Sequence, residues 1–486
     1  MKKIKLLSIF LIISILVLLI PISMHLFAKH KYSSNIKAKF NELLYKYEDF
    51  DDEIPVINLD TRNYSQNVKF INKTQAFGDI DYLFSLLKYG YSGYEYFGGD
   101  ESFLLAKQNI QDLIINFDKD TVSVSEFTDI IYSEINFIQD SHFKLGNYNL
   151  SNYTKYYSSR KLTFYKNNTG FYTFIGDEPF YLKEIIEGDV LDYMKPSLDI
   201  NGKPIYNIGI LSDTPDISIP VNLVLESIHN SRNMSISLFE YKPIYKENTN
   251  SYRYYEIDDI PVLEVNCLCR VTPEDQTIEN FIKDSKDMRK KDDLIIDLRN
   301  NMGGNLINVE QWFEGFTGTK LRKDIIQSGL YTSTSISLSK DKFQSKENEN
   351  ESVKGDCLKE VVSYKEKKYF PGWSTIKYKR FKPVKNKVNI IVLLDKNTSS
   401  AGEFFVYYLK KMGNVTLVGT NSNGCVLTGN CNLAYLPYSN ISLSLSHKLY
   451  VHPSFVSIEG LGILPDLWVK PEQALDRVVN YIKNNE

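Results

Sequence analysis

The sequence predicts an α/β protein with an N-terminal helical region, a β-rich middle section and an α/β core towards the C-terminus. Two observations predict this arrangement. Apolar residues recur at one-turn spacing before about residue 140, whereas beyond Ile260 apolar runs of strand length alternate with amphipathic helical stretches. Such alternation produces a parallel or mixed sheet covered by helices, with loops at the carboxyl ends of the strands available for a site.

Individual elements follow from these patterns. The Asn201-Gly202 turn between apolar flanks predicts a hairpin in the β-rich section, which is either part of a peptide-binding module or simply a hairpin. In the core we expect strands and helices, in alternation, at Val262–Val265, Thr272–Lys290, Leu294–Leu298, Val388–Leu394, Ala401–Met412 and Val415–Val418. Composition shifts divide the chain into an anchor or signal segment (1–28), a helical region (29–140), a β-rich region (141–255), the core (256–470) and a C-terminal helix (471–486).

Composition excludes several classes of protein. The 486 residues carry 57 basic and 60 acidic side chains, a net charge of −3, which argues against binding nucleic acid through bulk positive charge. Hydrophobic residues at 43% and charged residues at 24% are ordinary globular values, so disordered, collagen-like and disulfide-scaffold classes are excluded. No Cys/His spacing resembles a metal site, and we expect no metal or organic cofactor.

The first residues predict a membrane anchor. Lys2, Lys3 and Lys5 precede an uncharged run from Leu6 to Met24. As a helix this run spans about 28 Å, close to the hydrocarbon thickness of a bilayer. No small-residue cleavage site follows cleanly, so an uncleaved anchor is favoured over a cleaved signal peptide. Basic residues before the run favour an exported body, and we expect a single-pass, extracytoplasmic protein of the cell membrane, secreted if the segment is cleaved.

A serine stands at the turn between a predicted strand and a predicted helix. Ser400 is held by rigid elements on both sides, and the first free amides of the helix, beginning with Ala401, point at whatever the serine attacks. That arrangement suits a nucleophile whose product is an oxyanion. The other interpretation is a capping box between Ser400 and Glu403, which many helix starts contain.

A glycine pair follows the buried strand that ends at Leu298. The run 297–304 reads DLRNNMGG, and Gly303 and Gly304 would let the backbone approach a ligand with its amides as donors. The pair is otherwise just a turn, and it is not a phosphate loop because the Gly-Lys-Ser/Thr ending is absent. We expect Asp297 and Arg299 to brace this loop rather than to react.

Taken together, these motifs and the run 459–466 (EGLGILPD) resemble the carboxy-terminal processing and tricorn-type serine peptidases. The resemblance covers residues 260–470 in order and spacing, with a weaker match at 138–143 (IQDSHF). It implies a ClpP/crotonase-like α/β core, a β-rich region that is a degenerate PDZ-like module, and an endopeptidase acting on peptides or protein tails. It also implies an oxyanion hole made by the amides of Gly303 or Gly304 and of Ala401.

The two branches of this family differ in their general base. In the processing-protease branch a lysine stands 25 residues after the serine, and here that position is Cys425, with no lysine between Lys411 and Lys448. A Ser-Lys mechanism is therefore unsupported. The missing lysine also motivates a rival hypothesis, in which the chain is an inactive peptide- or ligand-binding homologue.

The tricorn-like branch uses a histidine from an upstream Ser-His pair and a downstream glutamate. Ser141, His142 and Glu459 stand in those positions, so the resemblance implies that His142 accepts the proton of Ser400 while Glu459 orients the network, directly or through Ser141. Histidine is the best matched base, because its unperturbed pKa is about 6.5. His142 could instead be a buried structural residue.

Two other histidines and the cysteines leave alternatives open. His447 and His452 lie close to Glu459 in sequence and are rival bases. A Cys425 nucleophile is disfavoured because no adjacent histidine activates it. Cys425 and Cys431 could close a short loop in an oxidising compartment. We expect Cys267 and Cys269 instead to be buried thiols on a strand.

Overall fold

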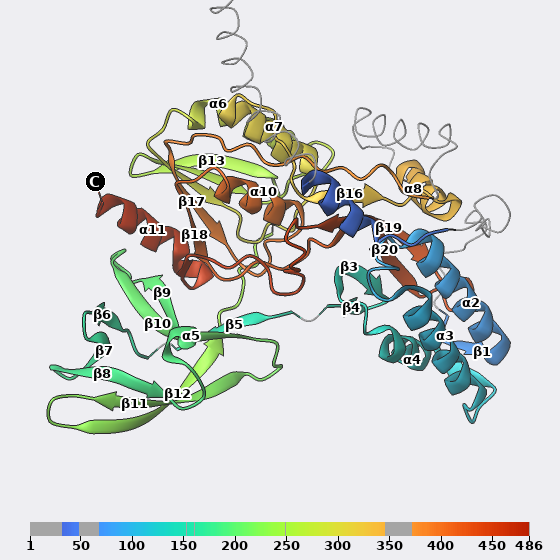
Figure 1. The fold of residues 1–486 in the computed structure, drawn as a ribbon, viewed down its shortest axis with the longest axis horizontal. Coiled ribbons are helices and arrows are strands. Elements are labelled where there is room, and N and C mark those ends of the chain that lie inside the picture. The colour runs from blue at the N-terminus through green and yellow to red at the C-terminus, as the bar shows by residue number, and fades with distance from the viewer. Residues whose placement is uncertain are drawn as a thin grey trace, which may run out of the picture.

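The computed structural model describes residues 32–47 and 68–485, except positions 152, 160, 248 and 346–371. Within these residues the chain is a mixed α/β protein with an N-terminal helical region (Figure 1), which confirms the predicted fold class. No helix among them combines the length and the apolar character needed to cross a bilayer. The run from Leu6 to Met24, for which we predict the anchor, lies outside the described residues.

A helix at residues 32–41 opens the described N-terminal region, and three more helices follow between residues 73 and 135. Side-chain caps explain where the first and the third of these three begin. Asn72 caps the first by accepting the Gln75 amide at 2.9 Å, and Ser123 caps the third through Glu126, so both helices begin at side chains suited to that position. Their apolar faces share one buried cluster with β-strands from the C-terminal third of the chain. The elements are β1 (Phe70–Asn72), α2 (Lys73–Gly90), α3 (Gly99–Ile115), β2 (Thr121–Ser123) and α4 (Val124–Ile135).

The middle of the chain forms an eight-stranded antiparallel sheet, seen in green in Figure 1, in the order β6-β7-β8-β11-β12-β5-β10-β9. The predicted hairpin is confirmed, because β9 and β10 pair antiparallel across Asn201-Gly202. Its interpretation as a peptide-binding module stays a prediction. The elements are β5 (Lys155–Ser158), β6 (Tyr165–Asn167), β7 (Gly170–Ile175), β8 (Glu178–Ile185), α5 (Val190–Tyr193), β9 (Met194–Leu198), β10 (Pro204–Ser212), β11 (Ser218–Glu226) and β12 (Ser231–Glu240).

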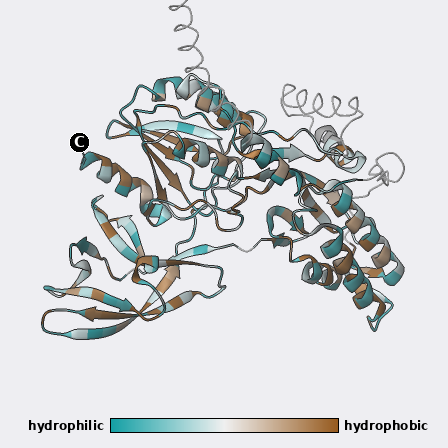
Figure 2. Cartoon of the chain, viewed as in Figure 1, coloured by the Kyte–Doolittle hydropathy of each residue, from teal (hydrophilic) through white to brown (hydrophobic). Residues whose placement is uncertain are grey.

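A six-stranded sheet carries the core, in the order β13-β14-β15-β17-β18-β21, parallel except for the edge strand β13. Ile296 and Val392 pack under α6, α7 and α10, whereas Ile295 and Ile391 pack under α11. Both faces are thus covered, and the central strand β17 is almost entirely apolar (Figure 2). The elements are β13 (Tyr252–Ile257), β14 (Ile260–Val265), α6 (Thr277–Met288), β15 (Asp293–Asp297), α7 (Leu306–Thr317), β17 (Asn389–Leu394), α10 (Ala401–Lys410), β18 (Val415–Gly419), β21 (Leu467–Trp468), η2 (Pro471–Gln473) and α11 (Ala474–Lys483).

A five-stranded sheet joins strands from the first third and the last third of the chain. β3 pairs with β20 through Leu145 and Leu443, so a strand from the first third lies beside one from the last. No local pattern predicts this pairing, and it sets the position of residue 142. The elements are β3 (Asp140–Leu145), β4 (Tyr148–Leu150), β16 (Ile326–Gly329), α8 (Ser333–Ser345), β19 (Thr428–Tyr435) and β20 (Ser442–Val451).

Candidate active site

Ser400 occupies the turn between β17 and α10, as the sequence predicts. Its backbone has φ 52° and ψ −118°, which an L-residue seldom adopts and which costs conformational energy. Two hydrogen bonds hold this turn: the Ser399 amide donates to the Asn301 carbonyl at 2.9 Å, and the Ser400 amide donates to Glu403 Oε2 at 3.0 Å. The hydroxyl is therefore presented by a fixed backbone.

The His142 ring reaches this hydroxyl from β3. Its Nε2 lies 3.2 Å from Ser400 Oγ, although the two residues are 258 positions apart. The His142 backbone amide donates to Asp140 Oδ1 at 2.9 Å, which fixes the strand beside the ring. Burial lowers the pKa of His142 below its ordinary value, even though the Asp140 charge acts in the opposite direction. The ring is thus neutral near pH 7 and able to accept a proton.

The rival histidines contact other side chains. His447 Nδ1 lies 3.3 Å from Asn432 Nδ2, and His452 Nδ1 lies 2.6 Å from Ser454 Oγ. Within the described part of the chain, His142 is the histidine whose ring hydrogen-bonds Ser400.

Cys425 lies on the other side of the His142 ring, with Sγ 3.2 Å from Nδ1. The sequence argument that Cys425 has no neighbouring histidine was wrong, because the histidine arrives from a distant strand. Burial raises the pKa of the Cys425 thiol well above its ordinary value, and the charges of Glu459 and Glu403 raise it further. The thiol therefore stays protonated at neutral pH, which disfavours Cys425 as the nucleophile for a different reason.

Glu459 contacts backbone rather than the histidine. Its Oε1 accepts the Ser141 amide at 2.8 Å, and its Oε2 accepts the amides of Val426 and Leu427 at 2.9 and 2.8 Å. The Ser141 hydroxyl donates to the Gly424 carbonyl at 3.0 Å and so does not link Glu459 to the ring. Burial raises the pKa of Glu459 to about 8, and the Asp140 charge contributes.

The glycine loop lies against the serine, as the sequence predicts, but its two glycines differ. The Gly303 amide already donates to Asn301 Oδ1 at 2.9 Å, which argues against Gly303 as an oxyanion donor. The Gly304 amide has no acceptor among the described residues, and Ala401 begins α10, where the first amides are unpaired within the helix. A Cβ on Gly303 would lie 2.8 Å from Ser400 Cβ, so only glycine fits there.

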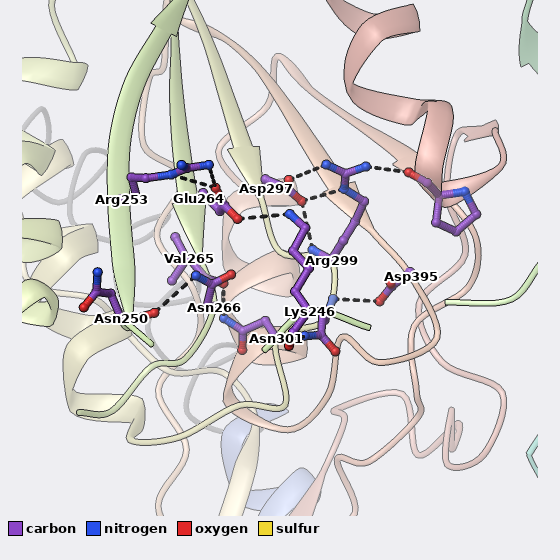
Figure 3. A network of polar contacts seen from close by, with 12 residues as sticks. Lys246, Asn250, Arg253, Glu264, Val265, Asn266, Asp297, Arg299, Asn301 and Asp395 are labelled. Atoms are coloured by element: carbon purple, nitrogen blue, oxygen red, sulfur yellow. Dashed lines mark hydrogen bonds and ion pairs between the residues drawn. The ribbon is translucent and has the colours of Figure 1, made fainter. Parts of the chain in front are cut away.

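Charged side chains stabilise the glycine loop. The buried Arg299 guanidinium pairs with Asp297 and also donates to the Pro471 carbonyl (Figure 3). Asp395 accepts the Asn300 amide at 3.0 Å, which ties the loop to the end of β17. The bracing role expected for Asp297 and Arg299 agrees with these contacts.

Glu403 has a larger role than a helix cap. It is fully buried, and its carboxylate accepts four donors: the amides of Ser400, Gly424 and Cys425, and the Ser422 hydroxyl. The capping-box interpretation accounts for the first of these alone. The remaining three come from a loop about 20 residues further along the chain, so the sequence gives no signal for them.

Lys396 is a second residue that the sequence analysis missed. Its ammonium donates to the carbonyls of Ser422, Asn423 and Gly460, at 3.1, 2.9 and 2.9 Å. Burial lowers the pKa of Lys396 to about 8. Three carbonyls accept hydrogen bonds from the three N–H groups of the Lys396 ammonium. Lys396 therefore links the loops that carry Cys425 and Glu459 rather than acting as a base.

The cysteine pairing is the reverse of the one expected. Cys267 and Cys269 form a disulfide, with Cα atoms 5.3 Å apart, whereas Cys425 and Cys431 are not bonded to each other. The expectation failed because the Cys425 thiol faces His142, which the sequence does not show. The bonded pair flanks Leu268, whose amide donates to the Gly303 carbonyl at 2.8 Å, so the disulfide lies beside the glycine loop.

A hydroxyl, a neutral imidazole and unpaired amides at the end of a parallel strand are the parts of a serine hydrolase. No group of three His, Cys, Asp or Glu side chains within the described ranges is placed to hold a metal ion. Residues 262–469 match the model of peptidase family S41, which confirms the predicted resemblance. No curated protein sequence matches the chain.

Solved structures that match this chain include mature CPAF in complex with lactacystin (15% identity, covering 85% of this chain and 99% of that one, TM-score 0.43). The photosystem II D1 C-terminal processing protease is similar at 12% identity, covering 83% and 96%, with a TM-score of 0.36. The tricorn protease is similar at 14% identity, covering 85% and 37%, with a TM-score of 0.36. All three TM-scores are below 0.5, and the family assignment rests on the sequence match.

Proposed function

We propose that the protein is a serine endopeptidase in which Ser400 attacks a peptide carbonyl and His142 accepts the serine proton. The observation that carries this proposal is the 3.2 Å contact between His142 Nε2 and Ser400 Oγ on an S41 core. The substrate class, a peptide or a protein tail, follows from the family. No step requires a metal or an organic cofactor.

The reaction follows from the geometry. As Ser400 Oγ bonds to the carbonyl carbon, its proton passes to His142 Nε2, and the carbonyl oxygen becomes an oxyanion that the amides of Gly304 and Ala401 stabilise. His142 then gives the proton to the leaving amine, which breaks the peptide bond and leaves an acyl-enzyme. Water, deprotonated by His142, hydrolyses the ester and restores Ser400.

Ser141 and Glu459 support this chemistry without touching the reacting atoms. Glu459 holds the Ser141 amide and the Val426 and Leu427 amides at once, so it fixes β3 against the loop that follows Gly424. We therefore assign Glu459 and Ser141 to positioning the base.

We place the enzyme outside the cytoplasm, tethered by the segment from Leu6 to Met24. The sequence of that segment supports an uncleaved anchor, and the Cys267–Cys269 disulfide is typical of an oxidising compartment. Protease digestion of intact cells tests this location: the body is digested from outside if the proposal holds, and is protected if it is wrong.

Substitution of Ser400 and labelling with a fluorophosphonate test the mechanism. Ser400→Ala should lower kcat by roughly 10⁴- to 10⁶-fold and abolish labelling. His142→Ala should do nearly the same, because the two groups act as a unit, whereas the matched control His452→Ala should retain both. If wild-type protein binds a peptide but neither labels nor turns it over, the rival binding-protein hypothesis holds. If His452→Ala abolishes labelling, the base is wrongly assigned.

A further inference from the structure

The base of a serine peptidase needs a defined tautomer. For His142 Nε2 to accept the Ser400 proton, the ring hydrogen must be on Nδ1, and the group that faces Nδ1 decides whether it is there. In this chain that group is the Cys425 sulfur, at 3.2 Å. Among the described residues no carboxylate oxygen hydrogen-bonds the His142 ring. Asp140 accepts the backbone amide of His142 instead, and Glu459 accepts the backbone amide of Ser141.

A protonated thiol fits this position as an acceptor. Thiol sulfur can act as a weak donor or a weak acceptor, and in the tautomer that a base at Nε2 requires, the imidazole Nδ1–H donates to it. This direction leaves the Nε2 lone pair facing Ser400 Oγ. The reverse bond, from S–H to Nδ1, would put the hydrogen on Nε2 and block proton transfer.

The backbone around the sulfur is held from both sides. Glu403 accepts the amides of Gly424 and Cys425, at 2.7 and 2.8 Å, and Glu459 accepts the next two, at 2.9 and 2.8 Å. Four consecutive amides are thus bound by two buried carboxylates. Because Glu459 also holds the Ser141 amide, one carboxylate fixes both the segment that carries the sulfur and the residue next to the histidine.

We propose that Cys425 is the positioning residue of the general base: its sulfur accepts the Nδ1–H of His142 and so sets the tautomer in which Nε2 faces Ser400. The inference rests on the proposed function and deepens it. The carboxylates of Glu403 and Glu459 act on the base only through the backbone that they hold.

Two substitutions in the full-length protein test this role. Cys425→Ala removes the acceptor and should lower kcat by roughly 10- to 100-fold with little change in KM, and should slow fluorophosphonate labelling equally. Cys425→Ser supplies a hydroxyl acceptor and should stay within about threefold of wild type. Cys431→Ala, at a cysteine whose sulfur lies 3.3 Å from Ser446 Oγ, should change neither constant. If Cys425 only packs, Ser would be no better than Ala, and each loss would follow the loss in Tm.

Nitrogen chemical shifts of labelled histidine give a readout that packing does not move. We expect the Nδ1–H tautomer at His142 in wild type and Cys425→Ser, and a mixture of tautomers in Cys425→Ala. An Nε2–H tautomer in wild type overturns the proposal, as does a Cys425→Ala enzyme with wild-type kcat. The tautomer of the wild-type protein tests the proposal even if Cys425→Ala does not fold. Failure of the proposed function gives a different result, because then either the wild type shows no turnover or Ser400→Ala keeps the turnover of the wild type.

Discussion

The nucleophile side of the site is built from neighbouring elements, whereas the base side is assembled from distant ones. Ser400 is set by β17 and α10, and its glycine loop follows β15, the adjacent strand. His142 comes from β3 and contacts Cys425, 283 positions further along the chain, and Asp140 and Glu459 are also buried on this side of the site. The position of the nucleophile is therefore set by local backbone geometry, whereas the position of the base depends on contacts with buried ionisable side chains.

After the loss of Ser400 or His142 itself, the largest expected effect comes from disrupting the oxyanion hole on the nucleophile side. Gly304→Ala should lower kcat by about 10²- to 10³-fold, the loss typical of removing one oxyanion donor. The reason is steric: a Cβ would lie 2.5 Å from the Leu268 carbonyl carbon at φ +136°, so the Gly304 amide must move. Steady-state kinetics measure the loss. Gly413→Ala, at φ +75° with open space around it, is the matched control and should keep wild-type kcat. Wild-type kcat in Gly304→Ala would exclude this amide as a donor.

The next effect tests Glu403, whose carboxylate joins the nucleophile side of the site to the base side. Glu403→Gln should lower the free energy of unfolding by about 1–6 kcal/mol, because the amide NH₂ must face either the Ser400 and Cys425 amides or the Ser422 hydroxyl and the Gly424 amide. Since the hydroxyl can also accept, one or two buried donors are left unsatisfied, each costing about 1–3 kcal/mol. Urea denaturation measures it. The exposed Glu314→Gln should change stability by less than about 0.5 kcal/mol. Equal stability of both variants would show that Glu403 is not held as described.

A pH series sharpens the comparison on the base side. Because burial raises the folded-state pKa of Glu459 to about 8 from an ordinary value of 4.5, the folded protein binds this proton more tightly than the unfolded chain. The contribution of Glu459 to stability is therefore complete below pH 4.5 and is lost as pH rises through about 8. Urea midpoints across this range should fall less steeply in Glu459→Gln than in wild type or Glu314→Gln. Parallel slopes in all three would contradict the prediction.

The smallest effect concerns the acid limit of activity. Burial lowers the pKa of His142 below 6.5, so the base stays neutral, and active, at more acidic pH than an exposed histidine would. The acid limb of kcat/KM against pH should have its midpoint below 6.5 in wild type and in His452→Ala alike. A midpoint above 6.5 would mean that a carboxylate charge, rather than burial, dominates at the ring.

Local signals predicted much of the nucleophile side. The strand before Ser400 and the helix that begins at Ala401 were both expected from sequence, and Gly303 and Gly304 were expected beside the serine. Sequence could not distinguish the two glycines, because the difference is a hydrogen bond that the Gly303 amide donates to the Asn301 side chain. It also missed Lys396, whose carbonyl partners come from two loops further along the chain.

The sequence by itself determined the α/β class, the strand-turn-helix around Ser400 and the resemblance to the family. These features follow from periodicity, turn chemistry and motif order, which are local properties of a chain. Only the tertiary structure decided that His142 rather than His447 or His452 meets the serine, that a thiol faces its other nitrogen, and which cysteines are bonded. The reason is that these contacts depend on the pairing of β3 with β20, and the packing of side chains from opposite ends of a chain leaves no pattern in either segment.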